Sequence, residues 1–152
     1  MVRFSKFKSA ACLILESVLI ELRKLDLHVQ RIKHDGGAEM GSSQWHDIMD
    51  AWGIQDVCAL AYTPNHVRAE RMIQFIKARM RVTLHSAKLP IATFWVNAAR
   101  DVVHKSNLIP REALNWDTPW ELVMGRPARV HRLRTFGSEA HVVRPADMKK
   151  SK

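Results

Sequence analysis

The sequence predicts an α/β protein, because short apolar segments of strand length alternate with longer segments whose apolar residues recur at helical spacing. Glycine, proline or a helix-capping residue separates most of these segments. The chain has 152 residues, and 47% of them are apolar. This length and composition suit one domain with a buried core, and they argue against a wholly disordered chain.

Two predicted strands flank one predicted helix at the start of the chain. Residues 1–7 alternate as a short strand does, and Ser9 is a candidate N-cap for a helix over residues 10–24. The apolar run that opens this helix stops at Glu16, so it is too short to cross a bilayer. Residues 27–33 form the second strand. The helix residues expected in the core are Leu13, Leu15, Val18, Leu19 and Leu22.

A second helix and a third strand follow a double-glycine turn. Ser42 or Ser43 is predicted to cap this helix, which runs to Trp52 and ends at Gly53 in the C′ position. Residues 56–61 contain a continuous apolar run. Such a run is typical of a buried strand in a parallel sheet.

The longest predicted helix covers residues 67–87. Thr63 and Pro64 favour a turn that leads into it, because proline is well tolerated in the first turn of a helix. Its apolar residues recur at helical spacing, which predicts one buried face. These residues are Ala69, Met72, Ile73, Ile76, Met80 and Leu84.

The remaining predicted elements are two helices and a late strand. Residues 90–105 form the first of these helices, with Phe94, Trp95, Ala98, Val102 and Val103 expected to be buried. Thr118 and Pro119 begin a short helix that Gly125 ends. Residues 139–143 are predicted to form the last strand.

Positive charge is concentrated at the C-terminal end. The net charge is +9, and residues 125–152 supply six of these charges through eight Lys or Arg against two Asp or Glu. This surplus favours a polyanionic partner, nucleic acid first. A solubilising tail explains the charge equally well. Cys12 and Cys58 are isolated thiols outside any Cys/His cluster, so neither a disulfide framework nor a structural zinc is indicated.

Two acids, Asp35 and Glu70, are candidates for metal binding. Asp35 follows a predicted strand and Glu70 lies in the first turns of a predicted helix, so the fold could bring them together. Magnesium in phosphoryl-transfer sites is typically held by one or two carboxylates plus water and phosphate oxygens. Each acid also has a structural explanation, because Asp-Gly favours a turn and the helix dipole favours an acid at the N-terminus. Local sequence leaves both readings open.

Basic residues on the long helix are candidates for nucleic-acid binding. They are Arg68, Arg71, Lys77, Arg79 and Arg81. Such side chains can follow a phosphate backbone through contacts that are independent of sequence and weaken with salt. A solvated helix face explains them equally well.

Several short motifs occur in a fixed order along the chain. They are Asp35-Gly36-Gly37-Ala38-Glu39, Gly53-Ile54, Thr63-Pro64, Ala69-Glu70-Arg71, Leu89-Pro90, Phe94-Trp95, Asn107, Pro110, Thr118-Pro119-Trp120-Glu121-Leu122, Gly125-Arg126-Pro127 and Leu133-Arg134-Thr135-Phe136-Gly137. One such motif would be weak evidence of relationship to a protein family, but the ordered series is specific evidence. Over roughly residues 6–143 the chain resembles the integrase catalytic core of copia-type retrotransposons.

This resemblance implies a partial ribonuclease-H-like fold. Its parts would be a short mixed sheet flanked by helices and, after it, a helical and basic C-terminal extension. The implied divisions are a truncated catalytic core at residues 1–88, a helical and strand extension at residues 89–145, and a basic tail at residues 146–152.

The resemblance also implies an activity. The family's Asp…Asp…Glu triad holds Mg²⁺ or Mn²⁺ for in-line phosphoryl transfer, as a polynucleotidyl transferase or endonuclease. Asp35 and Glu70 match its second and third acids, and would be both catalytic and metal-binding. The implied partners are the DNA of element ends and target, in the nucleus, without a membrane.

Two departures from the family affect this expectation. The strand that carries the family's first acid lies upstream of Asp35 and has no match here. The loop before Glu70 is also shorter by one residue and lacks the family's Asn-Gly pair. We therefore expect little activity from the chain alone, and an unpaired edge at residues 29–33 that favours self-association. A non-catalytic nucleic-acid-binding module and a protein-interaction module remain open as alternatives.

Overall fold

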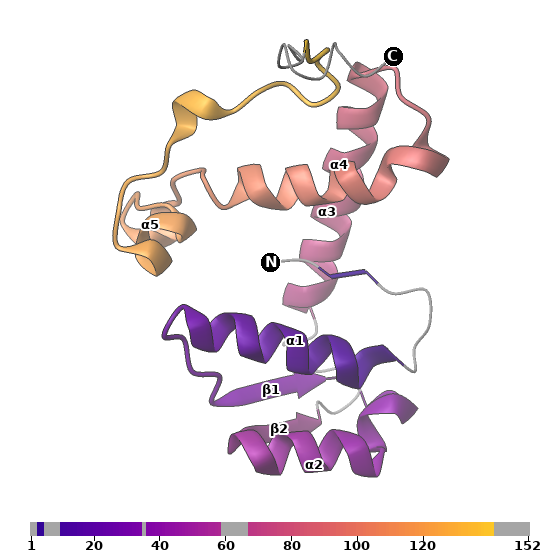
Figure 1. The fold of residues 1–152 in the computed structure, drawn as a ribbon, viewed down its shortest axis with the longest axis vertical. Coiled ribbons are helices and arrows are strands. Elements are labelled where there is room, and N and C mark those ends of the chain that lie inside the picture. Colours follow the sequence, from indigo (N-terminus) through magenta and orange to yellow (C-terminus); the bar gives the residue numbers. More distant parts are fainter. Residues whose placement is uncertain (1–2, 5–9, 35, 59–66, 142–152) are drawn as a thin grey trace, which may run out of the picture.

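The structure, a computed structural model, describes residues 3–4, 10–34, 36–58 and 67–141. Its main elements are α1 (Ala11–Lys24), β1 (Arg31–His34), α2 (Ser43–Trp52), β2 (Gln55–Cys58), α3 (Val67–Ser86), α4 (Ile91–Ser106) and α5 (Pro119–Met124). Figure 1 shows their arrangement. The α/β class is confirmed, although most of the described chain is helical.

The first half forms a small unit around a two-stranded sheet. β1 and β2 are parallel, with Arg31 opposite Gln55 and His34 opposite Cys58. The helix α2 lies between them in sequence, as a parallel connection requires. A core of side chains from α1, α2 and the residue before β2 holds the unit together. Its buried members are Cys12, Leu19, Trp45, Ile48, Met49 and Ile54.

The capping of α2 follows the sequence prediction. The Ser42 hydroxyl accepts a hydrogen bond from the backbone N–H of Trp45 at 3.3 Å, which satisfies a donor that the first turn leaves unpaired. Gly53 ends the helix with φ 61°, a left-handed conformation that costs glycine little. The N-cap of α1 is Ala10, without a side-chain bond; the predicted cap, Ser9, lies outside the described residues.

Both strands are shorter than predicted. β1 begins at Arg31 rather than at residue 27, because the chain turns at Asp26, with φ 58°, and β2 offers a partner only from Gln55 onward. The prediction of a strand over residues 27–33 was therefore wrong for its first half. The predicted strand at residues 56–61 is described as far as Cys58. Residues 3–4, the described part of the first predicted strand, are not in a strand.

The predicted mixed sheet is a parallel pair in the described part of the chain. The prediction of a late strand over residues 139–143 was wrong at residues 139–141, which have no strand structure; residues 142–143 lie outside the described ranges. A strand needs a neighbour for its backbone hydrogen bonds. This segment lies at the far end of the molecule from β1 and β2 (Figure 1).

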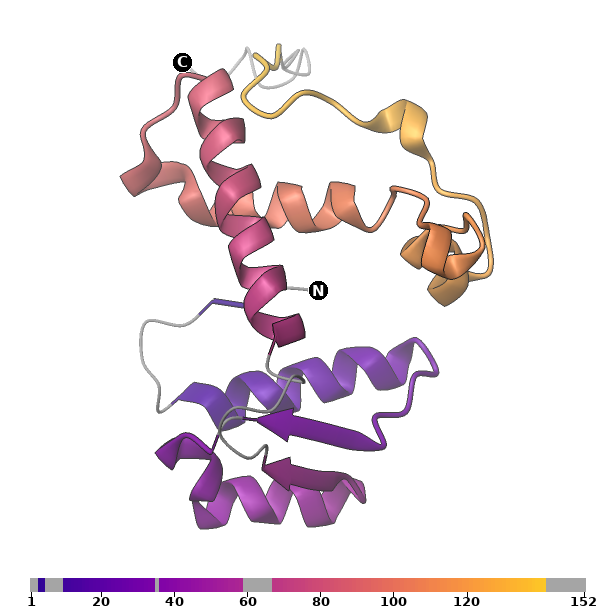
Figure 2. The ribbon, with the colours of Figure 1, turned by 180° about the vertical axis from the view of Figure 1, so that it is seen from behind.

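The second half is built on α3 and α4, which pack across each other (Figures 1 and 2). Leu84 and Ala98 have no exposed surface in this contact. The apolar face predicted for α3 is buried only toward its C-terminal end, because Met72 and Ile73 are 43% and 51% exposed. No helix in the described ranges has the length and apolar character needed to cross a membrane.

A capping box fixes the start of α5. The Thr118 hydroxyl accepts from the N–H of Glu121 at 3.0 Å, and the Glu121 carboxylate accepts from the N–H of Thr118 at 3.0 Å. The left-handed Gly125 ends the helix, with φ 61°. Both ends of this short helix thus match the sequence prediction.

The capping box predicts a pH dependence of stability. Hydrogen bonds from the backbone and then the hydroxyl of Thr118 lower the pKa of Glu121. A carboxylate with a depressed folded pKa stabilises fully above the unfolded value of about 4.3, and loses this contribution as pH falls through the folded pKa. We expect the difference in denaturant midpoint between wild type and Glu121→Gln to shrink as the pH falls below about 5 and through the folded pKa. A constant difference would contradict a stabilising carboxylate.

Candidate functional site

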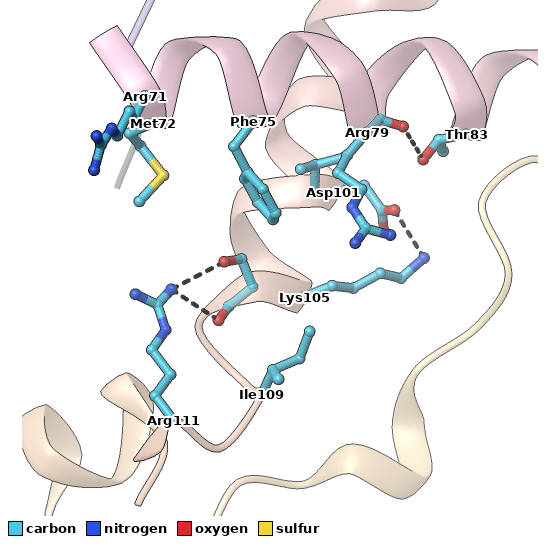
Figure 3. A pocket seen from close by; sticks show the side chains of 11 residues that line it. Arg71, Met72, Phe75, Arg79, Thr83, Asp101, Lys105, Ile109 and Arg111 are labelled. Atoms are coloured by element: carbon cyan, nitrogen blue, oxygen red, sulfur yellow. Dashed lines mark hydrogen bonds and ion pairs between the residues drawn. The ribbon is translucent and has the colours of Figure 1, made fainter. Parts of the chain in front are cut away.

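A groove with basic walls lies between α3, the C-terminal part of α4 and the loop that follows. Its volume is about 700 Å³, within the usual range for ligand sites. Its basic side chains are Arg71 and Arg79 from α3, Lys105 from α4 and Arg111 from the loop. Its apolar lining is Met72, Phe75, Val102 and Ile109. Figure 3 shows Phe75 projecting from α3 between these groups.

Local contacts orient two of the groove's guanidinium groups. The Arg79 guanidinium lies 5.6 Å from the centroid of the Phe75 ring, within the range of a cation–π contact. Arg111 donates to the hydroxyl and the carbonyl of Ser106, at 3.1 and 3.4 Å (Figure 3). These contacts reduce the side-chain freedom that a bound anion would otherwise have to remove.

Charge in the groove is strongly positive. Lys105 is paired with Asp101, the acid in the lining, at 2.7 Å. Arg71, Arg79 and Arg111 have no acidic partner among the residues that the structure describes. A concave surface with one sign of charge and apolar walls focuses the field. The groove is therefore suited to an anion that also has an apolar part.

The ion pair between Asp101 and Lys105 predicts the direction of a change in affinity. Asp101→Asn removes the opposing charge and releases Lys105, so affinity for a polyanion should rise. One further phosphate contact corresponds to almost tenfold at about 0.1 M salt. Fluorescence anisotropy with labelled DNA measures the change. Asp47→Asn, at an exposed acid of α2, controls for net charge; equal gains in the two variants would contradict a local effect.

A second basic hollow, of about 300 Å³, lies beside the C-terminal end of α4. Its positive charge comes from Arg126, Arg129 and Arg132, and the ring of Trp120 also lines it. These arginines belong to the basic segment that the sequence associated with a polyanionic partner. Both hollows border α4, since His104 of α4 lines the second.

The five basic residues predicted to bind nucleic acid fall on different sides of α3. Arg71 and Arg79 line the groove, four residues to either side of Phe75. Lys77 and Arg81 are exposed and lie outside the groove lining. At about 100° per residue they point away from Phe75, on roughly the opposite side. The fifth residue, Arg68, lies in α3, but its side chain is outside the described atoms.

The structure describes one of the two acids predicted to bind metal. Glu70 is exposed in the first turn of α3, and its spacing to Lys77 places the two on one face, away from the groove. Asp35 lies outside the described residues. The described ranges contain no group of three or more His, Cys, Asp or Glu that could hold a metal ion. Carboxylate oxygens are nevertheless the donors that magnesium prefers.

The residues around Asp35 form a hydrogen-bonded network. His34, the last residue of β1, accepts through Nδ1 from the N–H of Gly36 at 3.0 Å, and its Nε2 lies 2.9 Å from Asp56 Oδ1. Trp45 Nε1 donates to Asp56 Oδ2 at 2.9 Å. The network ties His34, at the end of β1, to Asp56 of β2 and through it to Trp45 of α2, and it ties Gly36 to His34.

Comparison with known proteins finds one curated relative of interest. The chain is 27% identical over 128 residues to the retrovirus-related Pol polyprotein from transposon TNT 1-94 of Nicotiana tabacum, covering 84% of this chain. It spans about a tenth (10%) of that polyprotein. The similarity supports a retrotransposon origin. No family model matches the chain, and no solved structure matches it.

Sequence patterns missed much of the groove. Phe75 could have been found, because it lies one helical turn from both Arg71 and Arg79. Lys105 and Arg111 have no such signal, since they approach α3 only through the crossing of α4 and the path of the loop after it. The network of His34, Trp45 and Asp56 was equally hidden, because its members come from three separate elements.

Proposed function

We propose that this chain is part of a retrotransposon integrase and binds nucleic acid through the groove between α3 and α4. The observation that carries the proposal is the convergence of Arg71, Arg79 and Arg111 on an apolar lining. Phosphate groups are the natural partners of such unpaired cations. The similarity to a Pol polyprotein supports a retrotransposon origin, and the resemblance of the ordered motifs points to its integrase part.

DNA in the nucleus is the partner that this origin suggests. Element ends and target DNA would both present phosphate backbones, which bind basic grooves with little regard to sequence. The second hollow, with Arg126, Arg129 and Arg132, adds basic side chains beside the C-terminal end of α4. The groove and this hollow could therefore bind nucleic acid even if Asp35 and Glu70 catalyse no reaction.

A salt titration tests the proposal. Duplex DNA affinity, measured by anisotropy at several salt concentrations, should fall with a slope of about −2.7 or steeper on a log–log plot. This value follows from about 0.9 per neutralised phosphate for three cations. A slope near zero would show that phosphate contacts do not drive binding, and would overturn the proposal.

We also propose that Asp35 and Glu70 contribute to a magnesium or manganese site in the assembled integrase. Bound metal would neutralise charge on a phosphoryl group. In this chain the network of His34, Trp45 and Asp56 includes the residue before Asp35 and is bonded to Gly36, the residue after it. Electron paramagnetic resonance of bound Mn²⁺ tests the pairing. Asp35→Asn and Glu70→Gln should each weaken binding, whereas unchanged binding in both variants would exclude a shared site.

Self-association is a second candidate function, favoured by the sheet. Within the described ranges β1 pairs only with β2, and a strand edge without a partner can take a strand from another chain. Light scattering over a range of concentrations tests this, and a monomer at every concentration would count against it.

A further inference from the structure

We propose that the groove takes an unpaired nucleic-acid strand, with one base stacked on Phe75. This inference rests on the proposed function and names the form of nucleic acid that the groove recognises. Phe75 is 38% exposed, and its neighbours Met72 and Ile109 are 43% and 57% exposed. Three large apolar side chains thus face solvent inside a basic groove.

A duplex cannot use this apolar surface. Its bases are stacked on one another, so it presents only phosphates, sugars and groove edges to a protein. An unpaired strand presents the flat faces of its bases, and aromatic side chains bind these faces without regard to sequence. Phe75 projects into the groove between α3 and α4 (Figure 3), so an unpaired base could stack on its ring, whereas a duplex would use only the basic side chains.

The basic residues are arranged to hold the backbone of such a strand. Arg71 and Arg79 lie one helical turn to either side of Phe75, so phosphates on both sides of the stacked base find a cation. Arg111 faces them from the opposite wall, held by Ser106. This combination of an aromatic platform with flanking cations is what single-strand binding requires.

An acidic peptide is the main competing occupant. It would satisfy the cations, but it would fill the apolar part only if it carried a large apolar side chain. A nucleotide combines charge and a flat apolar ring in one unit. The spacing of cations on both sides of one aromatic ring therefore favours the nucleotide.

The test compares two oligonucleotides of equal charge, thymidine and abasic strands of about eight nucleotides, which lies within the size range of single-strand sites. Wild type should bind the thymidine strand about 5- to 150-fold more tightly, which is the usual contribution of one stacked base. Phe75→Ala should remove this preference and leave the salt slope unchanged. Phe75→Trp should keep the preference for the thymidine strand, and the fluorescence of the introduced tryptophan should fall when this strand binds. The exposed Ile73 lies outside the groove lining, so Ile73→Ala should behave as wild type.

The outcomes separate the two claims. Equal binding of both strands with a steep salt slope would overturn base stacking and leave the proposed function intact. A flat salt slope for both strands would overturn the proposed function itself. Tighter binding of a Glu- and Leu-rich peptide than of the thymidine strand would assign the groove to a protein partner. A uridine strand bound as tightly as the thymidine strand would extend the inference to RNA.

Discussion

Replacing Arg71 and Arg79 together by glutamine should lower the affinity for duplex DNA about 60-fold at 0.1 M salt. Each neutralised phosphate contributes about 0.9 to the log–log salt slope, so two lost contacts remove about 1.8 decades of affinity between 1 M and 0.1 M salt. The slope should become shallower by the same 1.8. Both side chains line the groove and lack an acidic partner among the described residues.

The chain offers a matched control on the same helix. Lys77→Gln with Arg81→Gln removes the same number of charges from exposed residues outside the groove. Without walls to focus the field, this face should contribute little, and we expect a loss of about threefold. A larger loss for the control pair would place DNA on the face of α3 that carries Glu70, and would contradict the assignment to the groove.

Leu84→Ala should reduce the free energy of unfolding by about 2–5 kcal/mol, the range for a buried leucine cut back to alanine. Leu84 has no exposed surface where α3 meets α4, and Ala98 and Ala99 are similarly buried. The total free energy of unfolding of a small protein is about 5–15 kcal/mol. The loss is therefore large enough to separate the two helices that form the groove.

Chemical denaturation followed by circular dichroism measures this change. Val82→Ala is the matched control, because Val82 is on the same helix and is 62% exposed. It should change stability by less than about 0.5 kcal/mol. Similar values for the two variants would mean that α3 and α4 do not pack as the structure shows.

Local signals predicted the helices well and the strands poorly. Ser42, Gly53, Thr118 and Gly125 each act through neighbours in sequence, so their positions at helix ends could be predicted. Strand limits depend on a partner. β1 begins where Gln55 becomes available, and no pattern within residues 27–33 contains that information. The late strand was wrong at residues 139–141 for the same reason.

The candidate site shows the same division between local and distant information. The basic character of α3 was evident from composition, but composition could not separate Arg71 and Arg79 from Lys77 and Arg81. Their roles differ because α4 and Arg111 cover one side of the helix only. The pairing of Asp101 with Lys105 at i and i+4 was open to prediction, whereas its place in the groove was not.

Photo-crosslinking tests most directly whether an unpaired strand binds in the groove with a base on Phe75. A single-stranded oligonucleotide with 5-iodouridine, bound to the wild-type chain and irradiated, joins to side chains in contact with the base. We expect peptide mapping to find the adduct at Phe75 or Met72, with none on the segment around Lys77 and Arg81. Adducts on α1 or α2, or on the Glu70 face of α3 alone, would contradict it.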